Sequence, residues 1–392
     1  MRIFLHDYGG YAFTLQLARA WAKAGHSVYY SFSNSTQYVK RAAGGEATQG
    51  LTIKGVTLSK PYRKYSFIQR YQSETEHGRI VAGEIRNFHP DLVLSANTPL
   101  DAQSPILRAS KREHSRFVFW FQDAISIAIA RTMHRKWIFI GDLIGKYYQR
   151  LEQNLLRSSD KVILISVDFQ PLMNQWHVAK EKCVVIPNWM PLDEITPREK
   201  QNSWSREHGL QDKFCFMYTG ILGLKHDLGV FIQLAEHFYA HPEVCVLIVS
   251  EGEKADELKE KASALNLPNL VVLPFQAIGV YDQVLGTADV LVSVLNHDAG
   301  SYSVPSKVLT YLCSGKPILL SLPVENAAAR MVALAGAGLI SAPDNVDLFV
   351  QNAQKLYTNA SLREQMGYNG RTFAEKQFNI DSIMNQFKAV FP

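Results

Sequence analysis

Short apolar runs alternate with helical patterns along most of this chain. The first run, residues 2–5, precedes a helical pattern over 11–24 whose apolar positions recur every three or four residues, and a second run follows at 27–32. Gly25 separates that helix from the second run. A strand, a helix, a glycine and a strand in this order are typical of a βαβ unit, which predicts a parallel sheet.

The same alternation continues to residue 187 and then begins again in the second half. In the first half it predicts further strands at 92–95, 117–121, 162–166 and 184–187. In the second half it predicts strands at 214–219, 245–250, 270–273, 290–294 and 318–321, separated by helices such as 229–238, 255–265 and 280–287. Two doubly wound α/β units in one chain lead us to expect ligands between them, at the carboxyl ends of the strands.

A polar segment, residues 191–212, separates the two halves. It contains prolines and many charged residues, which is typical of a linker. We therefore expect a first domain over 1–190, a linker over 191–212, a second domain over 213–375 and a C-terminal helical segment over 376–392.

The bulk composition is that of a globular protein, but the charge is unevenly divided. The chain is 47% hydrophobic and 20% charged. Residues 1–190 hold 25 Lys and Arg against 14 Asp and Glu, whereas residues 191–392 hold 16 against 22. A basic first half favours an anionic partner such as phospholipid, a lipid pyrophosphate or nucleic acid, although the sequence shows no nucleic-acid-binding module.

The lack of targeting signals in the sequence and its cysteine usage favour a cytoplasmic location. No apolar run reaches the roughly 18 residues of a membrane span, and the N-terminus lacks the features of a signal peptide. The four cysteines lie far apart in the sequence, which argues against a disulfide framework or a metal site. We expect a cytoplasmic protein, with attachment to the inner face of the cell membrane as a further possibility.

The most informative stretch is residues 301–317, SYSVPSKVLTYLCSGKP. Pro305 suits the first turn of a helix, Ser303 or Ser306 is placed to cap it, and Gly315 ends it. A helix that begins after a loop of small residues attracts phosphate through its N–H groups, and Lys307 adds a positive charge there. An ordinary capped helix is the alternative interpretation.

Two glycine-containing turns also follow predicted strands. Gly220, just after the strand 214–219, lets the backbone approach a phosphate, and Lys225 is placed to neutralise one. Gly9 and Gly10 follow the first strand in the same way. A tight strand-to-helix turn is the alternative for both, with Lys225 as a solvated lysine in the Gly220 turn.

Asp123 ends the strand 117–121 together with Gln122. A carboxylate at the carboxyl end of a strand is well placed to orient an attacking hydroxyl or to stabilise positive charge in a reacting substrate. We therefore predict that Asp123 is a catalytic residue. The alternative is that it caps a helix over 124–130.

The segment 131–150 combines basic and apolar residues. Positions 140, 143, 144, 147 and 151 share one helical face, and we favour the interpretation that this face packs into the domain. The alternative is that the cluster at 137–140 lies on an anionic membrane with its basic neighbours. Residues 60–70 have a similar mixture.

The stretch 301–317 resembles the donor-binding segment of the family-four retaining glycosyltransferases, in which members close to this chain carry "VPSK…YL.SG.P". Val304–Lys307, Tyr311, Leu312, Ser314, Gly315 and Pro317 match that string. The resemblance implies the GT-B fold, two Rossmann-like domains facing each other across a cleft, with the last helix packed on the first domain.

The resemblance also implies an activity. We expect transfer of a sugar from a nucleotide-diphosphate sugar, with UDP-sugars the first candidates, and without a cofactor or metal. The acceptor would be a saccharide or a polyprenyl-linked saccharide in cell-surface polysaccharide or lipopolysaccharide biosynthesis.

Family members hold the nucleotide with loops that this chain also has. Glu251 lies in a loop near the nucleotide, and Phe275 is placed to stack on the base; a solvated carboxylate and a packed aromatic are the alternatives. The resemblance also assigns donor binding to residues of the two glycine-containing turns and of the stretch 301–317. These are Gly9, Gly10, Gly220, Lys225, Ser303, Val304, Ser306, Lys307 and Thr310.

The chain departs from the family pattern at three positions. Tyr302 and Thr310 replace the two glutamates of the family motif, and Ile221 replaces an arginine that contacts phosphate. Thr310 offers one uncharged hydroxyl where a carboxylate accepts two ribose hydrogen bonds. Two alternative functions therefore stay open: a non-catalytic nucleotide-binding or scaffolding subunit, and a sugar-nucleotide epimerase on the same fold.

Overall fold

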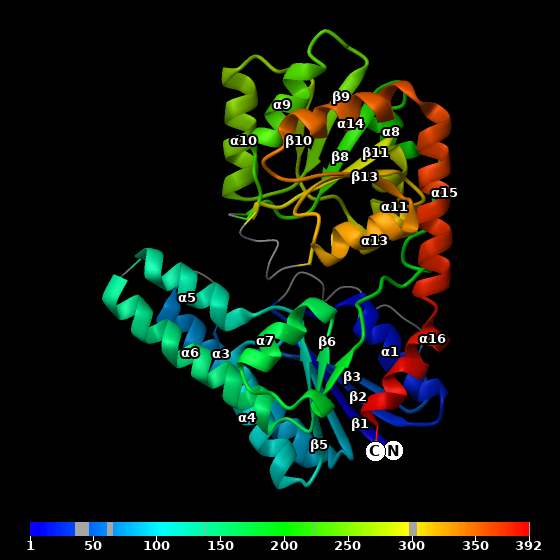
Figure 1. Cartoon of the computed structure of the whole chain (residues 1–392). Helices are drawn as coiled ribbons and strands as arrows, with labels where there is room; N and C mark the ends of the chain where they lie inside the picture. Colours follow the sequence, from blue (N-terminus) through cyan, green and yellow to red (C-terminus); the bar gives the residue numbers. More distant parts are fainter. Residues whose placement is uncertain (36–46, 61–65, 137, 224, 298–303, 392) are drawn as a thin grey trace. The chain divides into compact units, whose positions relative to one another are not determined.

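A computed structural model describes residues 1–35, 47–60, 66–136, 138–223, 225–297 and 304–391. The chain divides into two compact units, one of residues 1–191 with 380–392 and the other of residues 192–379. Each unit contains one sheet, and its strands pair in parallel. Figure 1 shows helices on both sides of each sheet.

The first unit is built on a sheet of seven strands in the order β3-β2-β1-β4-β5-β6-β7. Its inner strands are almost fully buried, because helices cover both faces of a parallel sheet. The strands are β1 (Arg2–Asp7), β2 (Ser27–Ser33), β3 (Leu51–Val56), β4 (Leu92–Ala96), β5 (Arg116–Phe121), β6 (Lys161–Leu164) and β7 (Cys183–Val185).

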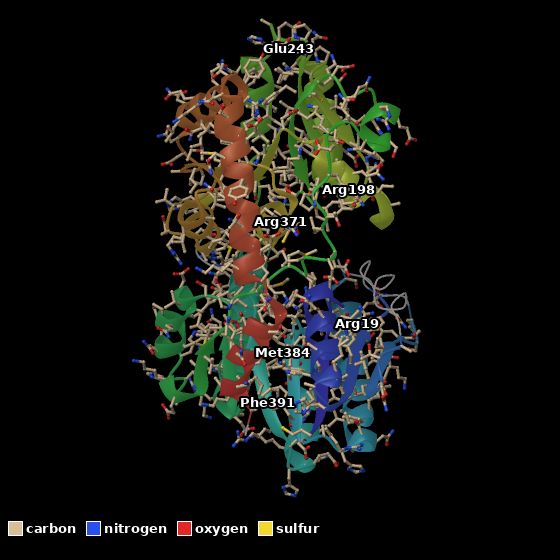
Figure 2. All side chains as sticks on the ribbon, turned by 90° about the vertical axis from the view of Figure 1, so that its right-hand side faces the viewer. Arg19, Arg198, Glu243, Arg371, Met384 and Phe391 are labelled. Carbon is tan, nitrogen blue, oxygen red and sulfur yellow. The ribbon has the colours of Figure 1, made fainter. Side chains whose placement is uncertain are left out.

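The helices of this unit include one from the far end of the chain. That helix, α16, packs on α1, and the Trp21 and Phe387 rings meet edge to face at 5.6 Å. Phe391, labelled in Figure 2, also contacts Trp21, at 5.4 Å. The helices are α1 (Ala12–Lys23), α3 (Phe67–Phe88), α4 (Leu100–Arg112), α5 (Ile125–Lys136), α6 (Ile138–Ser158), α7 (Gln170–Gln175) and α16 (Ile380–Phe387).

The second unit repeats this plan with six strands in the order β10-β9-β8-β11-β12-β13. The strands are β8 (Phe214–Thr219), β9 (Val244–Val249), β10 (Leu270–Leu273), β11 (Val290–Val294), β12 (Ile318–Ser321) and β13 (Gly338–Ser341). The helices are α8 (Ser203–Glu207), α9 (Gly229–His237), α10 (Glu253–Ala264), α11 (Tyr281–Thr287), α12 (Lys307–Ser314), α13 (Ala327–Ala335), α14 (Val346–Thr358) and α15 (Ala360–Gln377).

The predicted α/β class with two doubly wound units is confirmed, and four strands of the second half have the predicted bounds. The segment 191–212, which we expected to be a linker, instead forms part of the second unit from Leu192 on. It contains α8, and Trp204 is buried. Arg371 (Figure 2) donates from Nη1 to the carbonyls of Ile195 (3.1 Å) and Cys313 (2.8 Å) and so fixes the segment to the unit.

The strand order of each sheet reverses at one point, between β1 and β4 in the first unit and between β8 and β11 in the second. Helices that leave the two neighbouring strands there go to opposite faces of the sheet. The loops consequently diverge and leave a crevice at the carboxyl ends, where ligands of such sheets bind.

Helices α5 and α6 run side by side (Figure 1). Gly141 and Gly145 permit this close approach, because a Cβ on Gly141 would lie 2.2 Å from the carbonyl oxygen of Met133. The face of α6 that packs inward contains Gly141, Gly145, Tyr148, Glu152, Leu155 and Leu156.

The apolar face that we expected to pack inward is mostly exposed, so our favoured interpretation of it was wrong. The exposed fractions are 63% for Ile140, 71% for Leu143 and 53% for Tyr147, whereas Ile144 and Leu151 are half-buried. Phe139, in the neighbouring cluster at 137–140, is 89% exposed. The two glycines and Tyr148 take the inward positions because they allow α5 to approach. Among the described residues, no helix is both long and apolar enough to cross a membrane.

Two buried histidines connect β1 to α3. The Nε2 atoms of His6 and His77 lie 3.3 Å apart, and His6 Nδ1 lies 3.2 Å from the carbonyl oxygen of Ser31. If His6 donates to that carbonyl, its Nε2 accepts the proton of His77. Burial lowers the pKa of both rings, that of His77 to about 4, so both are neutral in the folded protein near pH 7.

We predict that this pair makes the protein sensitive to acid. Because the folded state keeps the imidazoles neutral, the unfolded chain binds more protons between about pH 6.5 and pH 4. The free energy of unfolding should therefore fall as the pH decreases through this window. His77→Gln should reduce the slope by up to about 1.4 kcal/mol per pH unit in chemical denaturation. His177→Asn, at an exposed histidine with φ of 53°, is the control; equal slopes for wild type and His77→Gln would contradict the prediction.

Candidate functional site

A pocket of about 250 Å³ lies at the carboxyl ends of β1, β4 and β5 in the first unit. It therefore occupies the point where the strand order reverses. Its lining combines aromatic faces with amide and carboxylate groups: Tyr8, Tyr11, Trp120, Asn97, Gln122 and Asp123. Such a lining suits a ring with several hydroxyl groups, because the faces bind the ring and the polar groups bind its hydroxyls.

Asp7 organises the turn after β1. Its carboxylate accepts hydrogen bonds from the N–H groups of Gly9 (3.1 Å) and Tyr11 (2.7 Å), from Thr14 Oγ1 (2.5 Å) and from Asn97 Nδ2 (3.0 Å). Burial raises the pKa of Asp7, while these hydrogen bonds act in the opposite direction. A carboxylate thus already occupies the start of α1, where a phosphate would otherwise bind.

The Asp7 turn contains Gly9 and Gly10, for which we predicted contacts with a phosphate. The Gly9 N–H donates to the Asp7 side chain, and the Gly10 N–H donates to the Asp7 carbonyl oxygen at 3.0 Å. Gly10 has φ of +67°, and a Cβ on Gly9 would lie 2.2 Å from the Tyr11 ring. Both glycines therefore shape the turn, and their N–H groups are used within the chain.

Asp123 is exposed at the pocket, between β5 and α5. Beside it, Gln122 forms a pair of side-chain hydrogen bonds with Asn188 (2.5 and 3.2 Å), which fixes the amide. Glu152, fully buried on α6, accepts the Ser126 N–H at 3.1 Å at the start of α5. Burial raises the pKa of Glu152 to about 7, with a smaller contribution from Asp123.

In the second unit, the turn after β8 is held by its own backbone. The Gly220 N–H donates to the carbonyl oxygen of Val249 at 3.0 Å, and the Gly223 N–H donates to His226 Nδ1 at 2.9 Å. Both glycine N–H groups are thus already satisfied. An anion at this turn has to be held mainly by lysine side chains.

Lys307 begins α12, and its ammonium group lies inside the unit. Nζ is 3.3 Å from the centroid of the Tyr218 ring, has almost no solvent-accessible surface and has no hydrogen-bond partner in the described part of the chain. Gly220, at φ +120°, makes room for it, since a Cβ there would lie 3.3 Å from Nζ. Burial, and secondarily the charge of Lys225, lower the pKa of Lys307 well below its usual value.

The elements next to Lys307 carry hydroxyl groups and a neutral imidazole. The OH of Tyr311 accepts the Thr219 N–H at 3.0 Å, and Thr219 Oγ1 lies 2.9 Å from the OH of Tyr281. His226 accepts a backbone N–H through Nδ1, and burial with the two lysines lowers its pKa to about 3. Among the residues that the structure describes, the surroundings of Lys307 are therefore polar but supply no carboxylate in hydrogen-bonding distance of its ammonium.

The other residues predicted around α12 have different environments. Lys225 is exposed in the turn after β8, Val304 and Thr310 are half-buried, and Ser306 is exposed. Ser306 makes no side-chain hydrogen bond at the start of α12, so the capping role expected of it is not observed. Ser303 lies outside the described residues, as does Tyr302.

Glu251 and Phe275 meet at the ends of β9 and β10. The Phe275 N–H donates to Glu251 Oε1 at 3.0 Å. The carboxylate of Glu251 therefore holds the backbone of the loop in which Phe275 sits half-buried. This hydrogen bond uses one of the two carboxylate oxygens of Glu251.

Sequence reasoning missed Asp7, Tyr218 and Glu152. Two of them carried a detectable signal: Asp7 is an acid between the first strand and two glycines, and Glu152 falls in register with the small and apolar positions of α6. The position of Tyr218 beneath a lysine 89 residues later could only come from the fold.

Two Rossmann-like domains, each with polar groups at the carboxyl edge of its parallel sheet, define the GT-B class of fold. The profile of Glycosyltransferase Family 4 matches residues 9–194, and that of Glycosyl transferases group 1 matches residues 200–373. The chain therefore belongs to the family-four glycosyltransferases. No sequence among the curated proteins matches it.

Solved structures share this fold over the whole chain. HepE from Anabaena, in complex with UDP and glucose, has a TM-score of 0.74 at 15% identity, covering 100% of this chain and 99% of its own. Sucrose-phosphate synthase from Thermosynechococcus elongatus has 0.75 at 13%, covering 100% and 98%. WaaG, a glycosyltransferase involved in lipopolysaccharide biosynthesis, has 0.67 at 13%, covering 100% of both chains.

We predict that Lys307→Met stabilises the protein without ligand by about 1 kcal/mol, because it removes a buried polar amino group that has no hydrogen-bond partner among the described residues. Urea denaturation measures this change. Lys225→Met, at an exposed lysine of the same site, is the control and should alter stability by less than about 0.5 kcal/mol. A loss of stability in Lys307→Met would show that the ammonium is already compensated.

Proposed function

We propose that this protein is a retaining glycosyltransferase that moves a sugar from a nucleotide-diphosphate sugar to a saccharide or lipid-linked saccharide. The second domain holds the donor and the first holds the acceptor. UDP-sugars are the preferred donors in this proposal, which is supported by the complexes of HepE with UDP and with UDP-glucose. The likeness to WaaG supports an acceptor of the lipopolysaccharide or surface-polysaccharide type.

The buried ammonium of Lys307 carries the donor assignment. A buried cation normally has an anionic partner, and Lys307 has none among the described residues. It lies where the strand order reverses, at the start of α12 and beside the Gly220 turn. A diphosphate placed here receives charge stabilisation from Lys307 and Lys225, and it keeps this stabilisation as charge develops on the leaving group.

The first-domain pocket suits the acceptor or the transferred sugar. Tyr11 is half-buried at the pocket and offers an aromatic ring, and Gln122 is held in place by Asn188. Asp123 is the group we assign to the reacting hydroxyl or to the positive charge that develops on the sugar. Its exposure leaves it accessible to a substrate.

Thr310 favours a second candidate function. It replaces the carboxylate that clamps the ribose in the family, and it is half-buried on α12. A protein that binds a nucleotide through its lysines but lacks this clamp would serve as a non-catalytic subunit in polysaccharide assembly. Nucleotide binding without turnover identifies this case, and conversion of a UDP-sugar with no acceptor present identifies an epimerase.

We predict that one nucleotide class raises the melting temperature of the purified protein. A ligand at 100 times its Kd stabilises by about 2.7 kcal/mol, which differential scanning fluorimetry with UDP, GDP, ADP and their sugar conjugates detects readily. Lys307→Met should lose most of this shift. Asp123→Asn should keep the shift and lose sugar transfer, because it is assigned to the reaction rather than to the nucleotide. The donor assignment fails if no nucleotide produces a shift.

We also propose that the exposed face of α6 binds the surface of an anionic membrane. Phe139, Leu143 and Tyr147 recur every four residues, so they lie along one side of the helix. Lys146 and Arg150 are exposed and flank this row. An apolar row between basic residues matches the interface of an anionic bilayer, where the rings enter the headgroup layer and the cations meet lipid phosphates.

We expect flotation with vesicles of phosphatidylglycerol and phosphatidylcholine, and little with phosphatidylcholine alone. Leu143→Glu should weaken this binding by about tenfold or more, since it removes an exposed leucine that would enter the membrane interface and adds a negative charge. Leu334→Glu, at an 80% exposed leucine of the second domain, is the matched control and should float like wild type. Equal flotation of the two variants, or no dependence on anionic lipid, would contradict the assignment.

A further inference from the structure

The side-chain nitrogen of Lys307 has a cation–π contact but no hydrogen-bonded anion in the described part of the chain. Its Nζ lies over the face of Tyr218, whose hydroxyl is turned to the carbonyl oxygen of Ile221 at 3.1 Å. The Tyr218 ring is itself fixed by edge contact with Phe231 at 5.3 Å. An aromatic face returns only about 0.5–2 kcal/mol to a cation, which is less than the cost of removing an ammonium from water.

The titratable groups on the surrounding elements do not compensate this charge. From the turn after β8, Lys225 is a second cation and His226 is neutral, with Nδ1 accepting a backbone N–H. From β8 and α12 come Tyr218 and Tyr311, and from α11 comes Tyr281, whose hydroxyl lies 2.9 Å from Thr219 Oγ1. Burial raises the pKa of Tyr218 and of Tyr311, so neither supplies a phenolate near neutral pH.

A bound diphosphate would reverse this balance. It brings two negative charges to a site that has two lysines and little water, where charge interactions are strong. The charged form of Lys307 is then favoured over the neutral form, whereas in the empty site desolvation and Lys225 favour the neutral form.

We propose that the donor diphosphate binds together with one proton, which Lys307 takes up from solvent as its side chain changes from the amine to the ammonium form. This inference rests on the proposed function, since it requires the diphosphate at this site. Lys307 thus binds the donor with uptake of a proton, whereas the exposed Lys225 contributes its positive charge without proton uptake.

The direction of the pH dependence follows from linkage. Because ligand binding raises the affinity of Lys307 for its proton, binding consumes a proton at any pH between its free and bound pKa values. Donor affinity should therefore fall as the pH rises through this interval, by up to tenfold per pH unit.

The experiment is titration calorimetry with UDP-glucose. At one alkaline pH, the binding heat is compared between phosphate and Tris buffer, and the affinity is then measured over pH 7–9. UDP-glucose is preferred to UDP because its diphosphate has no terminal phosphate that titrates near pH 6. Because Tris has a larger ionisation enthalpy than phosphate, the difference in binding heat gives the number of protons taken up. The wild type should take up close to one proton and bind more weakly at higher pH.

Three variants separate Lys307 from its surroundings, each checked for its fold by circular dichroism. Lys225→Met should bind more weakly but still take up a proton. Lys307→Arg keeps the charge at every pH, because arginine does not deprotonate in proteins, so any binding it shows should be free of proton uptake. Lys307→Met should lose most of the binding.

The outcomes distinguish this inference from the proposed function. Binding of UDP-glucose with the same heat in both buffers, and without pH dependence, would overturn the proton coupling and leave the donor site standing. Proton uptake that persists in Lys307→Arg would assign the coupling to another group and overturn it as well. Absence of UDP-glucose binding in the wild type would overturn both. Uptake in the wild type and in Lys225→Met, but not in Lys307→Arg, supports the inference.

Discussion

The reversal of strand order in each parallel sheet is the constraint on which the other features depend. A parallel sheet covered by helices on both faces has no room for polar side chains along its strands, so these gather where the strands end. In this protein both the Asp7 turn and the Gly220 turn follow the first strand of their sheet, beside the point of reversal. The two domains thus place their chemistry at equivalent positions of the same topology.

The two equivalent positions carry opposite charge. In the first domain the Asp7 carboxylate receives the N–H groups at the start of α1, so this turn has its anion built in. In the second domain the corresponding glycine N–H groups are satisfied by backbone and imidazole, and the unmatched charge is the ammonium of Lys307. Among the described residues, the turn of the second domain therefore has a buried lysine amino group without a hydrogen-bonded anion beside it, which is why we assign the donor to this domain.

Lys307 also illustrates how a binding site lowers stability when it is empty. Its amino group has lost water without gaining a hydrogen-bond partner among the described residues, and Gly220 is held at a positive φ beside it. Both features cost free energy in the isolated protein and become useful only with ligand present. The face of α6 shows a comparable compromise, because its exposed apolar row has no partner within the described residues of the domain.

The sequence by itself determined the α/β class, the two doubly wound units and most strand positions, because buried parallel strands leave apolar runs that are hard to mistake. It also located the Val304–Lys307 turn and the Gln122–Asp123 pair. Only the tertiary structure decided that residues 192–212 belong to the second domain. It also decided that α6 turns Gly141 and Gly145 inward and Leu143 outward, and that Lys307 lies over Tyr218. The reason is that periodicity records which positions are apolar, whereas the direction a helix face takes and the partner of a charge depend on elements distant in the chain.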